Sequence, residues 1–127
     1  MDLYFTAWTT LAVLAVYQWT CSSVGFARIK YKVVAPSMDG PPEFMRRVRV
    51  QMNTLEQLPM LVVPLWLCAW FLGDTWAAAG GVLWCVGRVV YALAYYRNPA
   101  KRAPGFIIST VASVLLMAGT VVGLLTH

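Results

Sequence analysis

The chain has 127 residues, of which 60% are hydrophobic and 12% are charged, and its formal net charge is +5. Soluble globular domains contain about 25% charged residues, so this composition excludes an ordinary water-soluble enzyme or binding module and indicates a membrane protein. A transmembrane barrel would need short segments of alternating polarity, and the sequence has none.

Four apolar segments follow one another along the chain. Each is close to the roughly 20 residues that a helix needs to cross the hydrocarbon core of a bilayer. Together they use most of the sequence, which leaves too little for a separate soluble domain. The expected fold is all-α and integral to the membrane, a single domain over residues 1–127 with four transmembrane helices at about residues 3–28, 42–72, 75–97 and 104–126.

The distribution of charge predicts the topology of these helices. The chain starts Met1-Asp2 without a basic stretch, so we expect the first helix to be retained rather than removed as a signal peptide. Basic residues crowd the first and third connections, whereas the second carries only Asp74. By the positive-inside rule, the first and third connections face the cytoplasm and both termini face the opposite side. Because this bias is a topology signal, the positive net charge gives no reason to expect nucleic-acid binding.

Several residues are expected at helix ends and helix contacts. The second connection is a tight turn, in which Asp74 or Thr75 is predicted to cap the third helix. Small residues of the fourth helix, such as Ser109, Ser113 and Gly123, should allow another helix to approach closely. Four tryptophans are expected mostly toward helix ends, as interfacial aromatic residues are: Trp66, Trp70, Trp76 and Trp84.

The three cysteines, Cys21, Cys68 and Cys85, are odd in number and show no C-x-x-C spacing. This pattern argues against a disulfide framework or a zinc site. We therefore expect reduced thiols and no bound metal.

Polar residues gather on one face of the second helix. Arg49, Asn53 and Glu56 are spaced i, i+4 and i+7, which places them on one side of a helix. Charged side chains inside a membrane are costly, and they nearly always face the bundle interior and have a partner. The stripe therefore predicts a polar site at the cytoplasmic end of this helix.

The third helix carries a matching pattern, with Arg88, Tyr91 and Tyr95 spaced i, i+3 and i+7. Arg88 is the only basic residue that lies outside a connection or a helix mouth, and Glu56 is the only acid inside a predicted span. We therefore expect Glu56 and Arg88 to pair across the bundle. Such a pair could also serve only to fix the helix register.

The charges of the site favour an anionic ligand. One glutamate cannot neutralise Arg49, Arg88 and Arg102 if these three converge. Arginine suits a carboxylate ligand, because its planar guanidinium can bind both oxygens at once. Glu56 could accept a hydrogen bond from an amine of the same ligand. The residues thus predict a site for a small zwitterionic or polyanionic molecule.

Two stretches, residues 41–59 ("PPEFMRRVRVQMNTLEQLP") and 87–105 ("GRVVYALAYYRNPAKRAPG"), closely resemble the signature regions of the MAPEG family, the membrane-associated proteins of eicosanoid and glutathione metabolism. The resemblance implies a homotrimer of four-helix bundles in membrane lipid, with glutathione as co-substrate between neighbouring subunits near the cytoplasmic side. In the family pattern, Arg49, Asn53 and Glu56 hold the carboxylates and the amine of glutathione.

The resemblance implies roles for further side chains. Arg102 stands where these enzymes place the arginine that faces the glutathione sulfur, so it is the expected catalytic residue. Gln51 would reach glutathione from the adjoining subunit, and Arg28 matches a further basic position. The residues that the family pattern places around glutathione are Arg28, Arg49, Gln51, Asn53, Glu56, Arg88, Tyr91 and Tyr95.

The implied chemistry follows from the charge of Arg102. A thiol with a pKa of about 8.5 is mostly protonated at neutral pH, and its thiolate is the nucleophile. A guanidinium close to the sulfur favours the anion. The expected activity is conjugation of glutathione to a lipophilic electrophile, or reduction of a lipid hydroperoxide, in a bacterial inner membrane.

The sequence departs from the better-known branches at three positions. Gln57 stands where several leukotriene-forming members have tyrosine, and Ile29 where they have a second arginine. Ala103 stands where the prostaglandin-forming branch has serine. These departures favour a broad-specificity transferase or peroxidase over an eicosanoid-specific synthase.

Two functions of other classes stay open. One is a non-enzymatic lipid-binding or scaffold protein of the same family, although such members tend to lose the glutathione ligands that this chain keeps. The other is a small multidrug exporter, which also has four spans and one membrane glutamate. In that family the acid lies in the first span, and here the first span has none.

Overall fold

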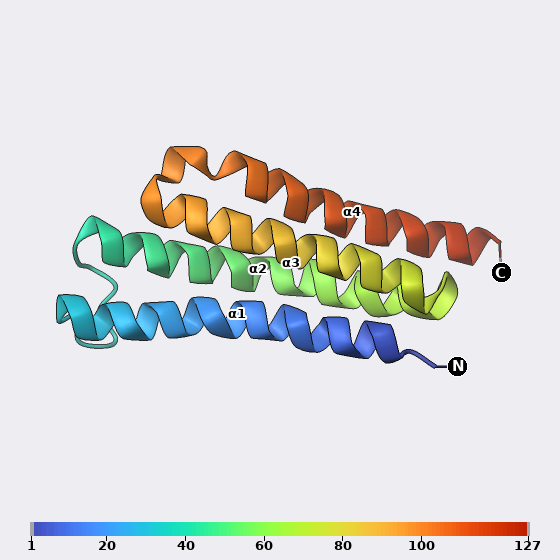
Figure 1. Ribbon diagram of the computed structural model, residues 1–127, viewed down its shortest axis with the longest axis horizontal. Coiled ribbons are helices and arrows are strands. Elements are labelled where there is room, and N and C mark those ends of the chain that lie inside the picture. Colours follow the sequence, from blue (N-terminus) through green and yellow to red (C-terminus); the bar gives the residue numbers. More distant parts are fainter. Residues whose placement is uncertain (1, 127) are drawn as a thin grey trace.

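The computed structural model describes residues 2–126, which form four long helices in an antiparallel bundle (Figure 1). Both termini lie at one end of the bundle, and the α1–α2 and α3–α4 connections lie at the other. All four helices are long and apolar enough to cross a membrane. The elements are α1 (Tyr4–Tyr31), α2 (Pro42–Phe71), α3 (Asp74–Arg97), the short 3-10 helix η1 (Pro99–Lys101) and α4 (Ala103–Leu125).

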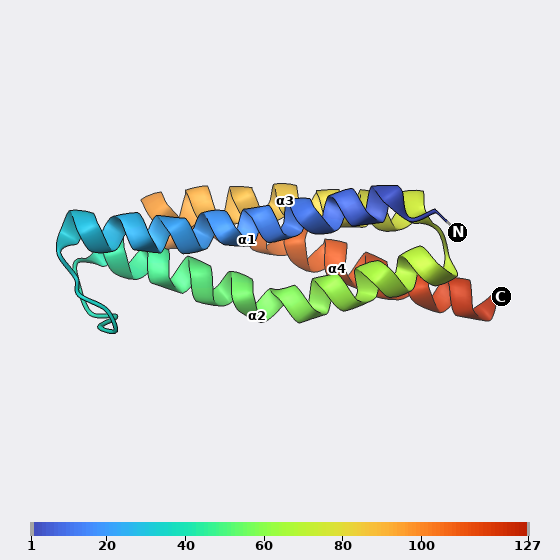
Figure 2. The same cartoon turned by 90° about the horizontal axis from the view of Figure 1, so that it is seen from below.

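The prolines of α2 explain its start and its shape. Pro42 is the first residue of α2, a position where the missing N–H has no helical partner to lose. Pro59 and Pro64 lie inside the helix, where each removes a backbone hydrogen bond and crowds the preceding turn. Figure 2 shows that α2 changes direction near its middle. The bend therefore falls beside the polar stripe that ends at Glu56.

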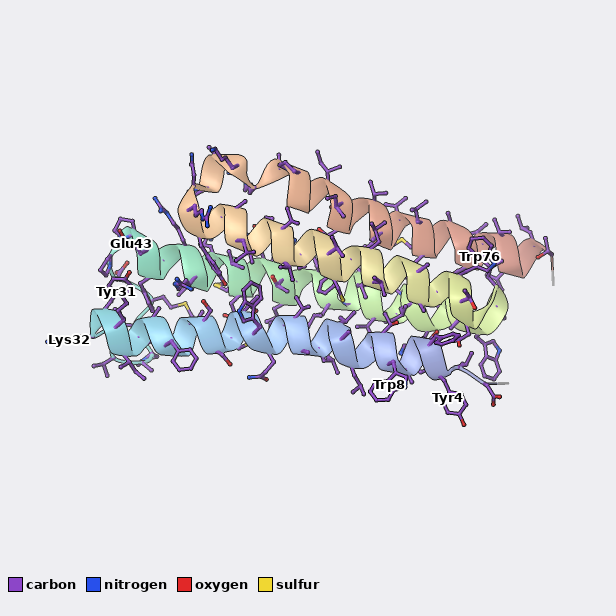
Figure 3. All side chains as sticks on the ribbon, viewed as in Figure 1. Tyr4, Trp8, Tyr31, Lys32, Glu43 and Trp76 are labelled. Carbon is purple, nitrogen blue, oxygen red and sulfur yellow. The ribbon has the colours of Figure 1, made fainter. Side chains whose placement is uncertain are left out.

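Aromatic residues mark both ends of the bundle. Tyr4, Trp8 and Trp76 lie near the end that holds the termini, whereas Tyr31 and Lys32 lie near the opposite end (Figure 3). The tyrosine and tryptophan side chains suit the two membrane surfaces, where one part of the ring meets lipid and another meets water. The aromatic residues at the two ends are therefore separated by about the length of the helices.

Trp84 contradicts the expectation that the tryptophans lie toward helix ends. Its side chain is fully buried, among Val13, Leu61 and Leu65 of the main apolar cluster. The indole N–H donates to Gln57 Oε1 over 3.0 Å, because a buried tryptophan needs a partner for that group. Trp84 is therefore a core residue. The exposed tryptophans of α2 and α3 are Trp66, Trp70 and Trp76.

Small residues of α4 allow α2 and α3 to approach closely, as predicted. Ser109, Ser113 and Gly123 are buried on α4. An added Cβ at Gly123 would lie 2.5 Å from the carbonyl oxygen of Phe71 in α2. At Gly105, in the first turn of α4, an added Cβ would lie only 2.3 Å from the backbone nitrogen of Tyr91. The backbones of α3 and α4 therefore touch at this level, which fixes the start of α4 against α3.

Asp74 caps α1, and the prediction that Asp74 or Thr75 caps α3 is wrong. The N-cap of α3 is Gly73, without a side-chain cap. The Asp74 carboxylate instead accepts from the backbone N–H groups of Thr6, at 2.7 Å, and Phe5, at 3.1 Å, and from the Thr6 hydroxyl at 2.6 Å. The first N–H groups of a helix lack partners within it, so Asp74 joins the beginnings of α1 and α3.

We expect Asp74→Ala to lower the midpoint of thermal unfolding in detergent. The substitution leaves two N–H groups of α1 without acceptors, which costs about 1–2 kcal/mol for a lost helix cap. Thr75→Ala is the matched control, because Thr75 is an exposed neighbour with no hydrogen-bonded side chain in the described part of the chain. Equal midpoints for the two variants would contradict this role of Asp74.

Candidate functional site

A cavity of about 470 Å³ lies between α2, α3 and α4. One part is polar, with side chains that include Asn53, Glu56 and Arg88, and another is apolar, with Met60 and Met117. Such a gradient suits a ligand with a charged part and a lipophilic neighbour. The lining residues are Asn53, Glu56, Gln57 and Met60 from α2, Arg88 and Tyr91 from α3, and Arg102, Phe106, Thr110, Ser113, Val114 and Met117 from the η1–α4 segment.

Asn53, Arg88 and Tyr91 form the centre of the polar part. Asn53 Nδ2 donates to the Tyr91 hydroxyl oxygen over 2.7 Å. The guanidinium carbon of Arg88 lies 3.9 Å from the centroid of the Tyr91 ring, which is a cation–π contact. A tyrosine hydroxyl that accepts one hydrogen bond still has its own proton to donate. Tyr91 can therefore donate to an anion in the cavity.

The expected ion pair between Glu56 and Arg88 is not formed. Arg88 is only 1% exposed; its Nε donates to Thr54 Oγ1 at 3.2 Å and its Nη1 to Ser109 Oγ at 3.4 Å. Glu56 is exposed and has no hydrogen-bond partner within residues 2–126. The Arg88 guanidinium donates to hydroxyl groups between the helices, whereas Glu56 is an exposed side chain that lines the same cavity. The site thus contains a buried guanidinium whose hydrogen-bond acceptors are all uncharged.

Arg102 reaches the same cavity from the α3–α4 connection. It is the N-cap residue of α4, directly after η1, and its side chain is exposed. Its Nη1 donates to the carbonyl oxygen of Pro99 over 2.9 Å. The Asn98 side chain accepts from the backbone of Ala100 and so holds the start of η1. This folded connection brings Arg102 to a cavity that Arg88 and Glu56 also line.

Four of the predicted residues do not line the cavity. Gln51 Nε2 donates to the Tyr17 hydroxyl of α1 over 2.9 Å, and Arg28 Nη1 donates to the Ser37 carbonyl over 2.6 Å. Tyr95 packs against Tyr91 at 5.6 Å between ring centroids, one turn nearer the connection. The fourth, Arg49, is exposed on α2. Gln51 and Arg28 thus belong to the α1–α2 side of the molecule.

Sequence reasoning missed the hydroxyl partners of Arg88. Thr54 and Ser109 are both fully buried, and each reads in the sequence as an ordinary small helical residue. It also missed Arg46, which donates to the last carbonyls of α3, those of Tyr96 and Arg97, at 3.4 and 3.3 Å. A basic side chain often satisfies such unpaired carbonyls. The Arg46 side chain thus belongs to the end of α3.

No cluster of three or more His, Cys, Asp or Glu side chains that could hold a metal ion occurs within residues 2–126. Cys21, Cys68 and Cys85 are unpaired.

Comparison with known proteins identifies a family that the chain matches over most of its length. The model of the MAPEG family matches residues 6–122. An uncharacterized protein of Synechocystis is 38% identical over 124 residues, which cover 98% of this chain and 90% of that protein. Microsomal glutathione S-transferase 2 of Homo sapiens is 38% identical over 93 residues, 73% of this chain and 63% of the human protein. Leukotriene C4 synthase of Bos taurus is 35% identical over 101 residues, 80% of this chain and 67% of the bovine protein.

Proposed function

The chain belongs to the MAPEG family, and we propose that it is a glutathione transferase of the membrane. The observation that carries the proposal is the cavity of about 470 Å³ where Arg88 and Arg102 meet Asn53, Glu56 and Tyr91. The four long apolar helices, together with the family, indicate an integral membrane protein. Relatives that are named as glutathione S-transferase and leukotriene C4 synthase support glutathione as the co-substrate.

The charges around the cavity match those of glutathione. At neutral pH glutathione carries two carboxylates and one ammonium group. Arg88 is buried with uncharged acceptors only, so a carboxylate would supply the missing negative charge. Glu56 has a free carboxylate at the same cavity and can accept from the ammonium group. The volume also falls in the range of about 300–1,000 Å³ that small-molecule sites occupy.

We assign activation of the thiol to Arg102. Its exposed side chain lines the cavity, and a guanidinium favours the anionic form of a nearby sulfur. The thiolate then attacks an electrophilic carbon, and a carbon–sulfur bond forms as the leaving group departs or a double bond is consumed. Reduction of a lipid hydroperoxide would use the same thiolate. The apolar part of the cavity, with Phe106 and Met117, offers the lipophilic substrate a place beside it.

We further propose that the protein is a homotrimer in which each cavity is completed by a neighbouring copy. Glu56 and Arg49 are exposed on a helix that crosses the membrane, and charged side chains that face lipid are costly. A polar neighbour and a bound ligand remove this cost. Gln51 and Arg28 lie on the α1–α2 side, away from their own cavity. In the proposed trimer they would reach glutathione in the site of an adjoining subunit.

The proposed orientation follows from the basic connections. The end of the bundle that holds the α1–α2 and α3–α4 connections would face the cytoplasm, by the positive-inside rule, and both termini would lie on the other side. Arg102 lines the cavity and lies at the basic end, so cytoplasmic glutathione would approach the cavity from that end. A bacterial inner membrane is the proposed location.

Titration with glutathione in a calorimeter tests the proposal. We expect binding by the wild type and a Kd about 10- to 100-fold higher for Glu56→Gln, because a hydrogen bond between charged groups is lost. The analogue glutaryl-Cys-Gly, which lacks the amine, should bind both proteins with similar affinity. Glu43→Gln, at an exposed acid outside the cavity, is the matched control. No binding of millimolar glutathione, with retained binding of lipid, would favour a scaffold protein instead.

A further inference from the structure

Gln57 is held in one orientation by a residue of the core. Its Oε1 accepts from the indole N–H of Trp84 over 3.0 Å, and Trp84 is fully buried. An indole nitrogen is a donor only, so the carboxamide oxygen must face Trp84. The carboxamide nitrogen, with its two N–H groups, must therefore point the other way.

The free side of this carboxamide faces the cavity. Gln57 lines the cavity beside Glu56, and its nitrogen has no hydrogen-bond partner within the described residues. The only buried side-chain polar atom without a partner in that part of the chain is the Tyr96 hydroxyl oxygen. The Gln57 nitrogen is therefore accessible from the cavity, and its N–H groups are available to a ligand.

Gln57 stands where the polar part of the cavity meets the apolar part. On α2 it lies one turn after Asn53 and one turn before Met60, and all three side chains line the cavity. Each turn advances the helix by about 5.4 Å, so the donor lies between the groups that would hold glutathione and the space for a lipophilic molecule. A ligand atom that accepts a hydrogen bond from Gln57 would therefore belong to the electrophile. It would lie close to the reacting carbon of that electrophile.

From this geometry, and on the basis of the proposed function, we propose that Gln57 selects electrophiles that carry a carbonyl oxygen conjugated to the reacting carbon, that is, α,β-unsaturated carbonyl compounds. The thiolate sulfur of glutathione forms a bond to the β-carbon. The π electrons of the carbon–carbon double bond shift toward the carbonyl, whose oxygen becomes an enolate. Water then delivers one proton to the α-carbon, and no oxidant or leaving group is needed.

The Gln57 carboxamide suits this step because charge develops on the carbonyl oxygen. A fixed N–H donor aimed at an oxygen that becomes negative stabilises the transition state more than the ground state. Reduction of a lipid hydroperoxide instead requires a proton donor, because the leaving oxygen must be protonated. A carboxamide N–H donates a hydrogen bond but does not give up its proton at neutral pH. The residue therefore favours conjugate addition over peroxide reduction.

The test compares two electrophiles in one assay. trans-4-Phenyl-3-buten-2-one carries the conjugated carbonyl, and benzyl chloride has no acceptor oxygen. We expect Gln57→Met, which keeps the volume and removes the donor, to lower the ratio of their kcat/KM values by tenfold or more. Gln57→Glu keeps an acceptor for Trp84 and replaces the donor by a carboxylate oxygen, so it should fold and lower the same ratio. Gln18→Met, at an exposed position of α1, should leave the ratio as in the wild type.

The outcomes separate this inference from the proposed function. If the wild type conjugates both compounds and the ratio in Gln57→Met and Gln57→Glu equals that of the wild type, the role of Gln57 is wrong and the transferase activity stands. If the folded wild type conjugates neither compound, the proposed function itself fails, and the role of Gln57 with it.

Discussion

Arg102→Leu is expected to abolish the thiolate absorbance of bound glutathione at neutral pH and to lower kcat by roughly 100- to 1,000-fold, the usual cost of removing a group that stabilises a developing or reacting anion. On the proposed function, the guanidinium of the wild type should lower the pKa of the bound thiol. Without it the pKa should return toward the ordinary value of about 8.5. The thiolate signal of the variant is therefore almost absent at pH 7 and grows as the pH rises through that value.

The position of Arg102 makes this substitution easy to interpret. Its side chain is exposed, and its one hydrogen bond goes to the Pro99 carbonyl in the same connection, so the fold should persist. Lys101→Leu is the matched control, since Lys101 is an exposed neighbour that does not line the cavity. Calorimetry with glutathione shows whether the ligand is still bound. A full thiolate signal in Arg102→Leu with bound glutathione would assign the role to another cation, such as Arg88.

Much of the fold follows from the sequence because the membrane imposes simple constraints. Four apolar segments of sufficient length predict four helices, since backbone polar groups must be satisfied within each segment. The structure departs in detail: α1 ends at Tyr31 rather than near residue 28. Asp74 shows the limit of local reasoning. Its position in a tight turn predicts a cap for the helix that follows, yet its carboxylate binds Thr6, a residue distant in the sequence.

Only part of the candidate site could be predicted from the sequence. Helical spacing correctly places Asn53 and Glu56 on one face of α2, and both line the cavity. Spacing within one helix does not show which groups of another helix meet that face. The pairing of Glu56 with Arg88 therefore failed, because Arg88 is satisfied by Thr54 and Ser109. Hydroxyl groups of buried small residues give no signal that distinguishes them in a sequence.

Gln57 and Trp84 illustrate the same limit. Gln57 is notable in the sequence only as a departure from a family pattern, and Trp84 reads as one of several interfacial tryptophans. Their hydrogen bond of 3.0 Å links a fully buried core residue to the wall of the cavity. Only the three-dimensional arrangement shows that the carboxamide has one fixed side and one free side.

Gly105→Ala is expected to lower kcat/KM by about 100-fold without removing any functional side chain. The added methyl would lie 2.3 Å from the Tyr91 nitrogen and 2.4 Å from its Cα, and backbone atoms of a packed helix cannot move aside as a flexible side chain can. The first turn of α4 must therefore shift away from α3. Arg102 directly precedes this turn, and a displacement of about 1 Å from a reacting group can cost about 100-fold in rate.

The matched control for this prediction is Gly25→Ala on α1, where an added Cβ meets nothing within 4 Å. Alanine favours a helix over glycine by about 1 kcal/mol, so Gly25→Ala should keep activity and raise the unfolding midpoint slightly. Gly105→Ala should lower both, because overpacking costs about 1–3 kcal/mol. Steady-state rates with benzyl chloride and glutathione, with thermal unfolding in the same detergent, measure the two effects. Wild-type activity in Gly105→Ala would show that the contact between α4 and Tyr91 does not position Arg102.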